Sequence, residues 1–363
     1  DALYQLAIAR RNDIKLAHVI AITGSAGKTT TKDVLAAILG ERTTSSAQSF
    51  NNDLGVPLTI LDAEDSDFLV VEVGANAVGE IEPLARLVQP DIAILTSIDK
   101  AHLEGFGDRD TVLREKTKLF DALPDDGIAI VPDTVDLSSI SISASVCRVG
   151  TSQDADVRIS IDVHKDGCAI LEMEGHRVTL ALLGAHNGMN VALAVVAAVH
   201  ANIRIGRSTS TKDLLDIASV VTGPKGRLHR VQVGDVTFLD DTYNANPASM
   251  RAAMRLFSVL DGERNVVVLG DMLELGSHEH AEHRHLASDI LNAGADLIVL
   301  VGSAMAAAAH IPASVYEPEA TDEAIERIVA LIRPHDTVLI KGSRGLRLER
   351  IIETKQQMKV SRH

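Results

Sequence analysis

Residues 23–30 combine two glycines with a lysine and three threonines, a set of residue types that suits a nucleotide phosphate. Backbone N–H groups in a glycine-containing turn that opens a helix attract phosphate. In such a loop the amine of Lys28 can reach the β- and γ-phosphates, and the hydroxyl of Thr29 can coordinate Mg²⁺. The alternative is a strand–helix turn without a ligand. The candidate phosphate-binding residues are Thr23, Gly24, Ser25, Ala26, Gly27, Lys28, Thr29 and Thr30.

This loop differs from two well-known patterns. A standard P-loop places a glycine where this chain has Ile22, so the loop is a shortened form. It also lacks the Gly-x-Gly-x-x-Gly of dinucleotide-binding oxidoreductases and carries Lys-Thr instead. The loop therefore favours Mg-ATP over a dinucleotide.

The elements that must position the loop alternate between short β-branched runs and longer helical stretches. We predict strands at 19–23, 68–73, 92–96 and 128–131, and helices at 28–39, 81–88 and 111–123. Such alternation indicates parallel strands with crossover helices. Glu72 then ends one strand, at the edge of the sheet where ligands of open α/β folds bind. The alternative for Glu72 is a solvated strand end.

The rest of the chain indicates a second domain. Short alternating segments between 146 and 183 predict a small antiparallel patch, and a helix follows at about 187–201. The breaker cluster at 223–226 marks a boundary. The predicted fold class is α/β, with a P-loop-type central ATPase domain of mainly parallel sheet (1–223) and a smaller Rossmann-like C-terminal α/β domain (224–363). The second domain's predicted strands are 236–239, 266–269, 297–301 and 337–340.

Composition excludes several classes of function. The net charge of −15 argues against a nucleic-acid partner, which needs a basic face. Two cysteines without a Cys-x-x-Cys pair argue against a zinc site and a disulfide scaffold. The longest apolar stretch is too short to span a bilayer, and no signal peptide is apparent. We expect a cytoplasmic protein without membrane insertion.

Several longer stretches resemble the Mur ligase superfamily, whose phosphate loop has this shortened form. They are 51–57, 72–75, 101–104, 184–187, 240–247, 269–276 and 341–344. The last three resemble the MurF-type branch, which joins D-alanyl-D-alanine to a UDP-N-acetylmuramoyl tripeptide. The resemblance implies an ATP-dependent, ADP-forming amide ligase of peptidoglycan synthesis that acts through an acyl phosphate. It also implies two Mg²⁺ ions, small-molecule substrates and a monomer.

The resemblance assigns a role to each candidate residue. The implied metal ligands are Thr29, Glu72, His102 and Lys116, the last as a carbamate. Asn187 and Asn190 would hold adenine, Arg227 the phosphates and Asp241 the ribose, with Lys28, Glu72, His102, Lys116 and Arg227 as the catalytic set. The implied substrate-binding residues are Asn51, Asn52, Tyr243, Asn244, Asn246, Lys341 and Arg344.

Three of these roles have structural alternatives. Without the resemblance His102 would be a structural histidine, because magnesium prefers oxygen ligands. Lys116 could equally lie on a charged helix face beside Glu115, and Asn187 could be a helix cap. The histidines at 278, 280, 283 and 285 favour a solvated helix start over a metal site, although one of them could line a cleft.

Two departures from the family pattern bear on function. The phosphate loop begins about twenty residues into the sequence, so the N-terminal domain that holds the UDP group in such ligases is expected to be absent. The chain would then be a fragment, or a Mur-like amide ligase acting on a carboxylate without UDP. The other departure is 96–99, Thr-Ser-Ile-Asp, where the family shows Thr-Asn-Ile-Gly. A non-catalytic nucleotide-binding module is disfavoured by the retained set Lys28, Thr29, Glu72, His102 and Lys116.

Overall fold

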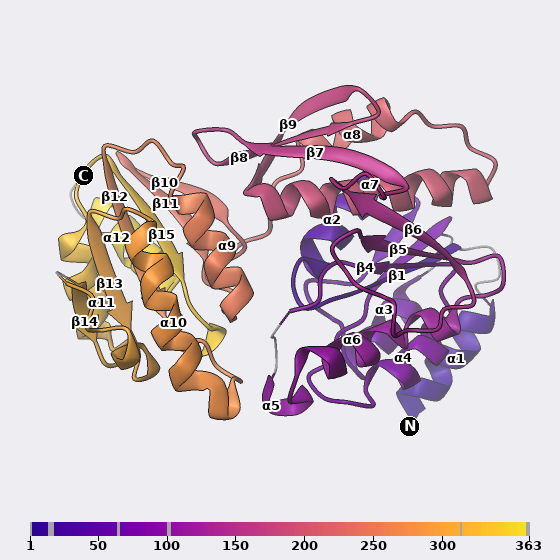
Figure 1. The fold of residues 1–363 in the computed structure, drawn as a ribbon, viewed down its shortest axis with the longest axis horizontal. Coiled ribbons are helices and arrows are strands. Elements are labelled where there is room, and N and C mark those ends of the chain that lie inside the picture. Colours follow the sequence, from indigo (N-terminus) through magenta and orange to yellow (C-terminus); the bar gives the residue numbers. More distant parts are fainter. Residues whose placement is uncertain (1, 14–17, 64–65, 100–102, 313, 361–363) are drawn as a thin grey trace. The chain divides into compact units, whose positions relative to one another are not determined.

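The computed structural model describes residues 2–13, 18–63, 66–99, 103–312 and 314–360. It divides into two compact α/β units, which Figure 1 shows in indigo to magenta and in orange to yellow. The first unit comprises Asp1–Asp162, Ala169–Ala181 and Ala185–Val221, and the second comprises Val163–Cys168, Leu182–Gly184 and Thr222–His363.

The first unit contains a sheet with the strand order β2-β3-β1-β4-β5-β6-β7-β8-β9 in its described residues. Every pair from β2 to β7 is parallel. The central strands are almost entirely buried, as expected for parallel strands covered on both faces. The strands are β1 (His18–Thr23), β2 (Thr43–Ser45), β3 (Phe68–Glu72), β4 (Ile92–Leu95), β5 (Ile128–Pro132), β6 (Ser145–Gly150), β7 (Val157–Val163), β8 (Cys168–Met173) and β9 (His176–Leu183).

Helices cover both faces of this sheet. On one face α2 (Lys28–Leu39) and α7 (Ala185–Arg204) pack against each other and on the central strands, and α8 (Thr211–Ser219) packs on both. On the other face an aliphatic core joins the strands to α3, α4 and α6. The helices outside the first face are α1 (Ala2–Asp13), α3 (Gly55–Asp62), α4 (Ile81–Val88), α5 (Leu103–Phe106) and α6 (Arg109–Thr117).

The second unit contains a sheet with the order β10-β11-β15-β12-β13-β14. Only β10 runs antiparallel to its neighbour among these described strands. One core packs α9 and α10 on the sheet, and a second packs α11 and α12. The elements are β10 (His229–Val233), β11 (Val236–Asp241), α9 (Pro247–Phe257), β12 (Arg264–Gly270), α10 (Glu279–Asn292), β13 (Leu297–Val301), β14 (Ser314–Glu317), α11 (Asp322–Leu331), β15 (Asp336–Lys341) and α12 (Arg350–Val360).

The predicted α/β class and both parallel sheets are confirmed, whereas the patch between 146 and 183 differs from its prediction only in how it begins. Its first strand, β6, pairs in parallel with β5, and β7 pairs in parallel with β6. The segment after β5 crosses over before β6 begins, so the new strand continues the main sheet. The three segments predicted as antiparallel correspond to β7, β8 and β9, which are neighbours in the sheet and are joined by connections of four and two residues, too short for parallel pairing. Their antiparallel arrangement agrees with the prediction, but through β6 they extend the main sheet, which was not predicted.

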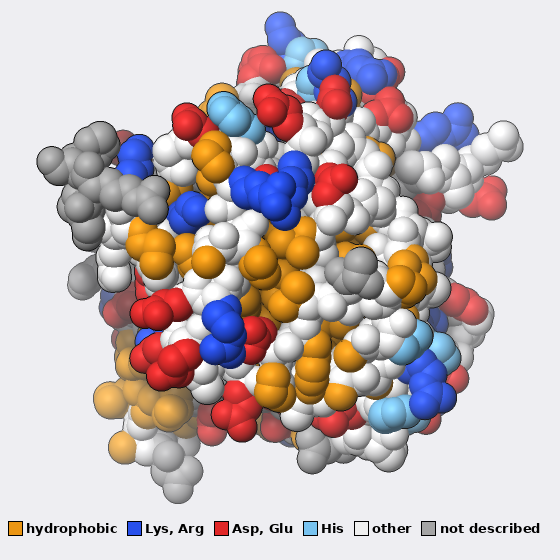
Figure 2. All heavy atoms as spheres, turned by 90° about the vertical axis from the view of Figure 1, so that its left-hand side faces the viewer, with side chains coloured by type: hydrophobic (Ala, Val, Ile, Leu, Met, Phe, Trp, Pro, Cys, Tyr) orange, Lys and Arg blue, Asp and Glu red, His pale blue; other side chains and the backbone are white. Residues whose placement is uncertain are grey.

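The surface carries both signs of charge. Figure 2 shows one face on which hydrophobic side chains gather near the middle, with acidic and basic side chains interspersed around them. Such mixing does not create a large field of one sign on this face. Within the described residues, no helix is both long enough and apolar enough to cross a bilayer.

Candidate functional site

The phosphate loop joins the end of β1 to the start of α2, as predicted. Gly24 has φ +145° and Gly27 has φ +86°, values that favour glycine. A Cβ atom on Gly24 would lie 2.0 Å from Oγ1 of Thr96, and one on Gly27 would lie 2.4 Å from Oδ1 of Asn190. Both glycines are therefore required by conformation and by close packing.

The segment after β4 supports this loop from the neighbouring strand. The backbone N–H of Ser25 donates to the carbonyl of Ser97 (2.9 Å), and that of Ala26 donates to the Ser97 hydroxyl (3.0 Å). The N–H of Asp99 donates to the Ser25 hydroxyl (3.0 Å). The residues that depart from the expected family pattern at 97 and 99 thus still fix the loop through hydrogen bonds.

Lys28 and Thr29, the first two residues of α2, both make hydrogen bonds to other candidate residues. The Lys28 ammonium donates to the carbonyl of Gly24 (2.9 Å), at the base of the loop. The Thr29 hydroxyl donates to Oε2 of Glu72 (2.8 Å), and the other carboxylate oxygen accepts from the amide of Asn51 (2.7 Å). Glu72 ends β3 and is 1% exposed. Because Mg²⁺ prefers hard oxygen ligands, the Thr29–Glu72 pair fits that ion.

The two asparagines at 51 and 52 have different local roles. A Cβ atom on Gly74 would lie 2.7 Å from Cγ of Asn51, so this glycine makes room for the side chain that holds Glu72. The side-chain oxygen of Asn52 accepts from the N–H groups of Leu54 and Gly55 (3.2 and 2.9 Å), at the start of α3. Asn51 therefore faces the Thr29–Glu72 pair, whereas the Asn52 oxygen accepts hydrogen bonds at the start of α3.

Lys116 lies on α6, and its side chain is 1% exposed. Its ammonium lies 5.6 Å from the centre of the Phe106 ring. Burial and the nearby charge of Lys28 lower the pKa of Lys116 from 10.5 to about 7. A substantial fraction of this lysine is then a neutral amine at neutral pH, the form that reacts with CO₂. His102 lies outside the described residues.

Asn187 and Asn190 lie together on the first turns of α7 and are buried. The amide of Asn190 donates to Oδ1 of Asn187 (2.9 Å). Asn187 is the third residue of the helix, so it does not occupy the N-cap position. The contact of Asn190 with Gly27 brings this pair beside the phosphate loop, in agreement with a joint nucleotide site.

In the second unit, Asp241 and Lys341 end neighbouring parallel strands in register. The two charged groups lie 2.7 Å apart, and the Lys341 ammonium also donates to the carbonyl of Asn244 (2.9 Å). Asp241 further accepts from the N–H of Leu228 (3.2 Å). These two candidates thus bind each other and fix the loop that follows β11.

Arg227 and Tyr243 form a stacked pair. The guanidinium carbon lies 4.2 Å from the centre of the Tyr243 ring, within the range of a cation–π interaction. Gly226 has φ +76°, and its carbonyl accepts from the N–H of Tyr243 (3.0 Å). Arg344 has a largely exposed side chain and pairs with Glu349 at 3.0 Å.

Asn246 caps α9 through a reciprocal capping box with Ser249. The Asn246 side chain accepts from the N–H of Ser249 (2.9 Å), and the Ser249 hydroxyl accepts from the N–H of Asn246 (3.0 Å). The Asn244 side chain also acts locally, accepting from the N–H of Ala245 (2.8 Å).

We expect Asn246→Ala to lower the free energy of unfolding by about 1 kcal/mol, because it removes an N-cap acceptor. Asn246→Asp, which keeps an acceptor, should restore most of that loss. Urea denaturation of both variants checks this expectation. Equal stability of the alanine variant and the wild type would contradict the capping role.

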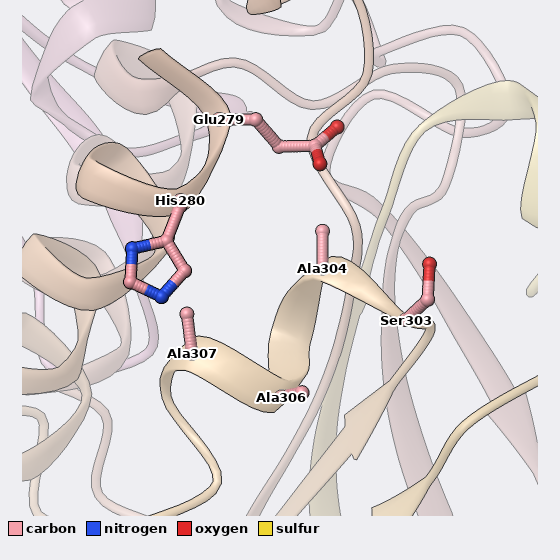
Figure 3. A pocket seen from close by; sticks show the side chains of 6 residues that line it. All are labelled: Glu279, His280, Ser303, Ala304, Ala306 and Ala307. Carbon is pink, nitrogen blue, oxygen red and sulfur yellow. The ribbon is translucent and has the colours of Figure 1, made fainter. Parts of the chain in front are cut away.

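The histidines at 278–285 open α10, but they do not all face solvent. His283 is fully buried: its Nε2 accepts from the N–H of Met272 (2.9 Å), and its Nδ1 lies 2.8 Å from the carbonyl of Glu279. The solvated helix start is therefore wrong for this one residue, because it holds the loop after β12. His280 and Glu279 line an open hollow of about 300 Å³ above η3 (Ala304–Ala307), as Figure 3 shows. In the described ranges, no group of three or more His, Cys, Asp or Glu residues could hold a metal.

Comparisons with known proteins agree with this geometry. Residues 22–198 match the Mur ligase middle domain, and residues 226–344 match the family described as "Mur ligase, glutamate ligase domain". The UDP-N-acetylmuramoyl-tripeptide–D-alanyl-D-alanine ligase of Bacillus subtilis is 32% identical, over 97% of this chain and 78% of that protein. The chain belongs to the Mur ligase family. It is therefore an ATP-dependent, ADP-forming amide ligase.

Solved Mur ligases share the fold along nearly the whole chain. MurF from Acinetobacter baumannii is 33% identical, with a TM-score of 0.88 and coverage of 98% of this chain and 80% of that one. MurF from Thermotoga maritima in complex with ADP is 24% identical, with a TM-score of 0.85 and coverage of 100% and 84%.

Sequence reasoning missed several polar residues that support the site of this Mur ligase. Ser46 and Ser49 contact Glu72 and Thr29, and the buried Lys32 binds the segment that carries them. Lys32 lies four residues after Lys28, on the same helix, so helical spacing was the available signal. Its partners at 46 and 48 are distant in sequence and could not be found that way.

Proposed function

We propose that this Mur ligase joins D-alanyl-D-alanine to a UDP-N-acetylmuramoyl tripeptide in peptidoglycan synthesis. The observation that carries the proposal is the 32% identity, over 97% of the chain, to a ligase named for these substrates. The arrangement of the nucleotide site also supports it, because Glu72 and the Asn187–Asn190 pair lie beside the loop that carries Lys28 and Thr29. The ligase would work as a cytoplasmic monomer.

Lys28 would move from the Gly24 carbonyl to the β- and γ-phosphates, while the loop N–H groups bind phosphate oxygens. Thr29 and Glu72 would hold one Mg²⁺, and a carbamylated Lys116 with His102 a second. Bound Mg²⁺ would neutralise charge on the phosphates. Asn187 and Asn190 would hold adenine, with Asp241 at the ribose and Arg227 at the phosphates.

The reaction has two steps. A carboxylate oxygen of the tripeptide attacks the γ-phosphorus, the bond to the β-phosphate oxygen breaks, and ADP leaves. The dipeptide amine, having lost a proton, then attacks the carbonyl carbon of the acyl phosphate. The C–N bond forms, the C–O bond breaks, and phosphate leaves with the proton that the nitrogen gives up on becoming an amide. The residues act mainly by positioning and charge neutralisation.

The amine substrate would bind at the loops that follow β11 and β15, and in the first unit Asn51 and Asn52 are proposed to bind substrate. Tyr243, Asn244 and Asn246 lie on the first of these loops. Of the two candidate anchors for the dipeptide carboxylate, Arg344 is the more accessible, because Lys341 is buried against Asp241. We place the domain boundary at 223/224, which is supported by the start of the long segment of the second unit at Thr222.

An assay of ADP release tests the proposed function. Continuous ADP release should require both the UDP-muramoyl tripeptide and D-alanyl-D-alanine, with one amide product per ADP, because without the amine the reaction stops at the acyl phosphate. The control replaces the UDP substrate by the same tripeptide without its UDP-sugar. Preference for that free carboxylate would favour the alternative, a Mur-like ligase for non-UDP substrates. A rate of ADP release that is the same with and without the two substrates would contradict the ligase function.

A further inference from the structure

Lys32 is a lysine that the proposed mechanism does not use and that the structure buries. It lies on α2, three residues after Thr29, and its side chain is 2% exposed. Burying a charged ammonium is costly unless its N–H groups are paired. A lysine in this position therefore needs specific acceptors.

The Lys32 ammonium has three acceptors. It donates to the carbonyls of Ser46 (2.6 Å) and Gln48 (2.8 Å), and it lies 2.9 Å from Oδ1 of Asp33. An ammonium group has three N–H donors, so its hydrogen-bonding capacity is matched. Two of the three partners are backbone groups of one segment, 46–51, which is the first part of the connection from β2 to α3.

This segment contains a strained residue. Gln48 has φ +47°, a left-handed conformation that is unfavourable for a residue with a Cβ atom. Such conformations persist where the surroundings hold them, and they concentrate at functional sites. Lys32 binds the carbonyl of this same residue, so it stabilises the conformation that directs the segment toward β3.

The segment 46–51 carries three side chains that act on the Thr29–Glu72 pair. The Ser46 hydroxyl accepts from the N–H of Glu72 (3.0 Å), and the Ser49 hydroxyl lies 3.3 Å from that of Thr29. The Asn51 amide donates to Oε1 of Glu72 (2.7 Å). The position of this segment therefore decides how the carboxylate and the hydroxyl are presented.

We infer that Lys32 is a positioning residue for the metal of the nucleotide site. Its ammonium fixes the segment 46–51, and the segment fixes Glu72 and Thr29 for Mg²⁺. The inference rests on the proposed role of that pair in holding Mg-nucleotide. It adds a residue that touches neither metal nor nucleotide.

Calorimetry with ADP, with and without Mg²⁺, tests the inference in the full chain. We expect Mg²⁺ to strengthen ADP binding in the wild type, and Lys32→Met to reduce that strengthening by about 10-fold or more, as for other residues that orient metal ligands. ADP affinity in excess chelator should change less than about 2-fold, because the phosphate loop is unaltered. The matched control is Lys212→Met, because Lys212 is an exposed residue of α8. Its ADP affinity, with and without Mg²⁺, should equal that of the wild type.

The outcomes separate this inference from the proposed function. If Mg²⁺ does not change ADP binding in the wild type, the assignment of Thr29 and Glu72 as Mg²⁺ ligands is overturned, and the inference with it. A Mg²⁺-responsive wild type with an equally responsive Lys32→Met would overturn the inference alone. If Lys32→Met does not fold, the double variant Lys32→Met/Gln48→Gly replaces it. Glycine at position 48 removes the left-handed strain, so this variant should fold and should show the weakened Mg²⁺ response. Failure of both variants to fold would show a structural role only.

Discussion

Replacing Lys28 with alanine should lower the kcat for ADP formation by about 1000-fold or more, since it removes a cation from the transferred phosphate. The side chain is not part of a hydrophobic core, and its ammonium donates to the Gly24 carbonyl at the base of the loop. The fold should therefore survive. Steady-state ADP release and thermal unfolding measure the two effects separately.

Lys212→Ala is a suitable control for this variant, because it removes an exposed lysine from the same unit. Its turnover and melting temperature should match the wild type. Near-normal turnover of Lys28→Ala would rule out phosphoryl transfer at this loop. A large drop in melting temperature would instead assign the residue to folding.

The second large effect is expected at Lys116. Lys116→Ala should lose activity by about 100-fold or more, and short carboxylates such as acetate should restore part of it by replacing the carbamate oxygens. Lys118→Ala is the neighbouring control: Lys118 pairs with the buried Glu115 at 2.7 Å, so its loss should lower stability, whereas the activity of the folded enzyme should change only a few-fold. A lack of rescue together with full activity after CO₂ removal would contradict the carbamate.

The pH dependence of carbamylation follows from the lowered pKa of Lys116. CO₂ reacts with the neutral amine, which forms as pH rises through the pKa of about 7. From pH 6 to pH 8 the neutral fraction should rise from roughly one-tenth to nine-tenths. Enzyme freed of CO₂ and then given a fixed concentration of dissolved CO₂ should regain activity to a greater extent at pH 8 than at pH 6.

Much of the nucleotide-binding unit could be predicted because its strands are buried on both faces. Such strands appear in the sequence as continuous β-branched runs, and β1, β3 and β4 lie within one or two residues of their predicted bounds. The strands at the edge of the sheet were harder to predict. Short alternating segments do not reveal their partners, so β6 was assigned to an antiparallel patch although it extends the parallel sheet.

The polar contacts of the site could not be predicted from local sequence patterns, because they join residues that are distant in the chain. Asp241 and Lys341 were each predicted at a strand end, but their ion pair follows from the parallel register of β11 and β15. His283 was grouped with exposed neighbours, and only the path of the loop after β12 explains its burial. Residue types and spacing thus predicted that the loop lies between β1 and α2, whereas register and loop paths decided which residues support it.

The second unit is assembled from three stretches of chain, so the polypeptide passes from one unit to the other five times, after residues 162, 168, 181, 184 and 221. Leu183 is buried in the core of the second unit, far upstream of the segment that begins at Thr222. A gene fragment cut at that point would encode a second unit with a gap in its core. Recombination between relatives could therefore exchange this unit cleanly only if both short upstream stretches, 163–168 and 182–184, were inherited with it.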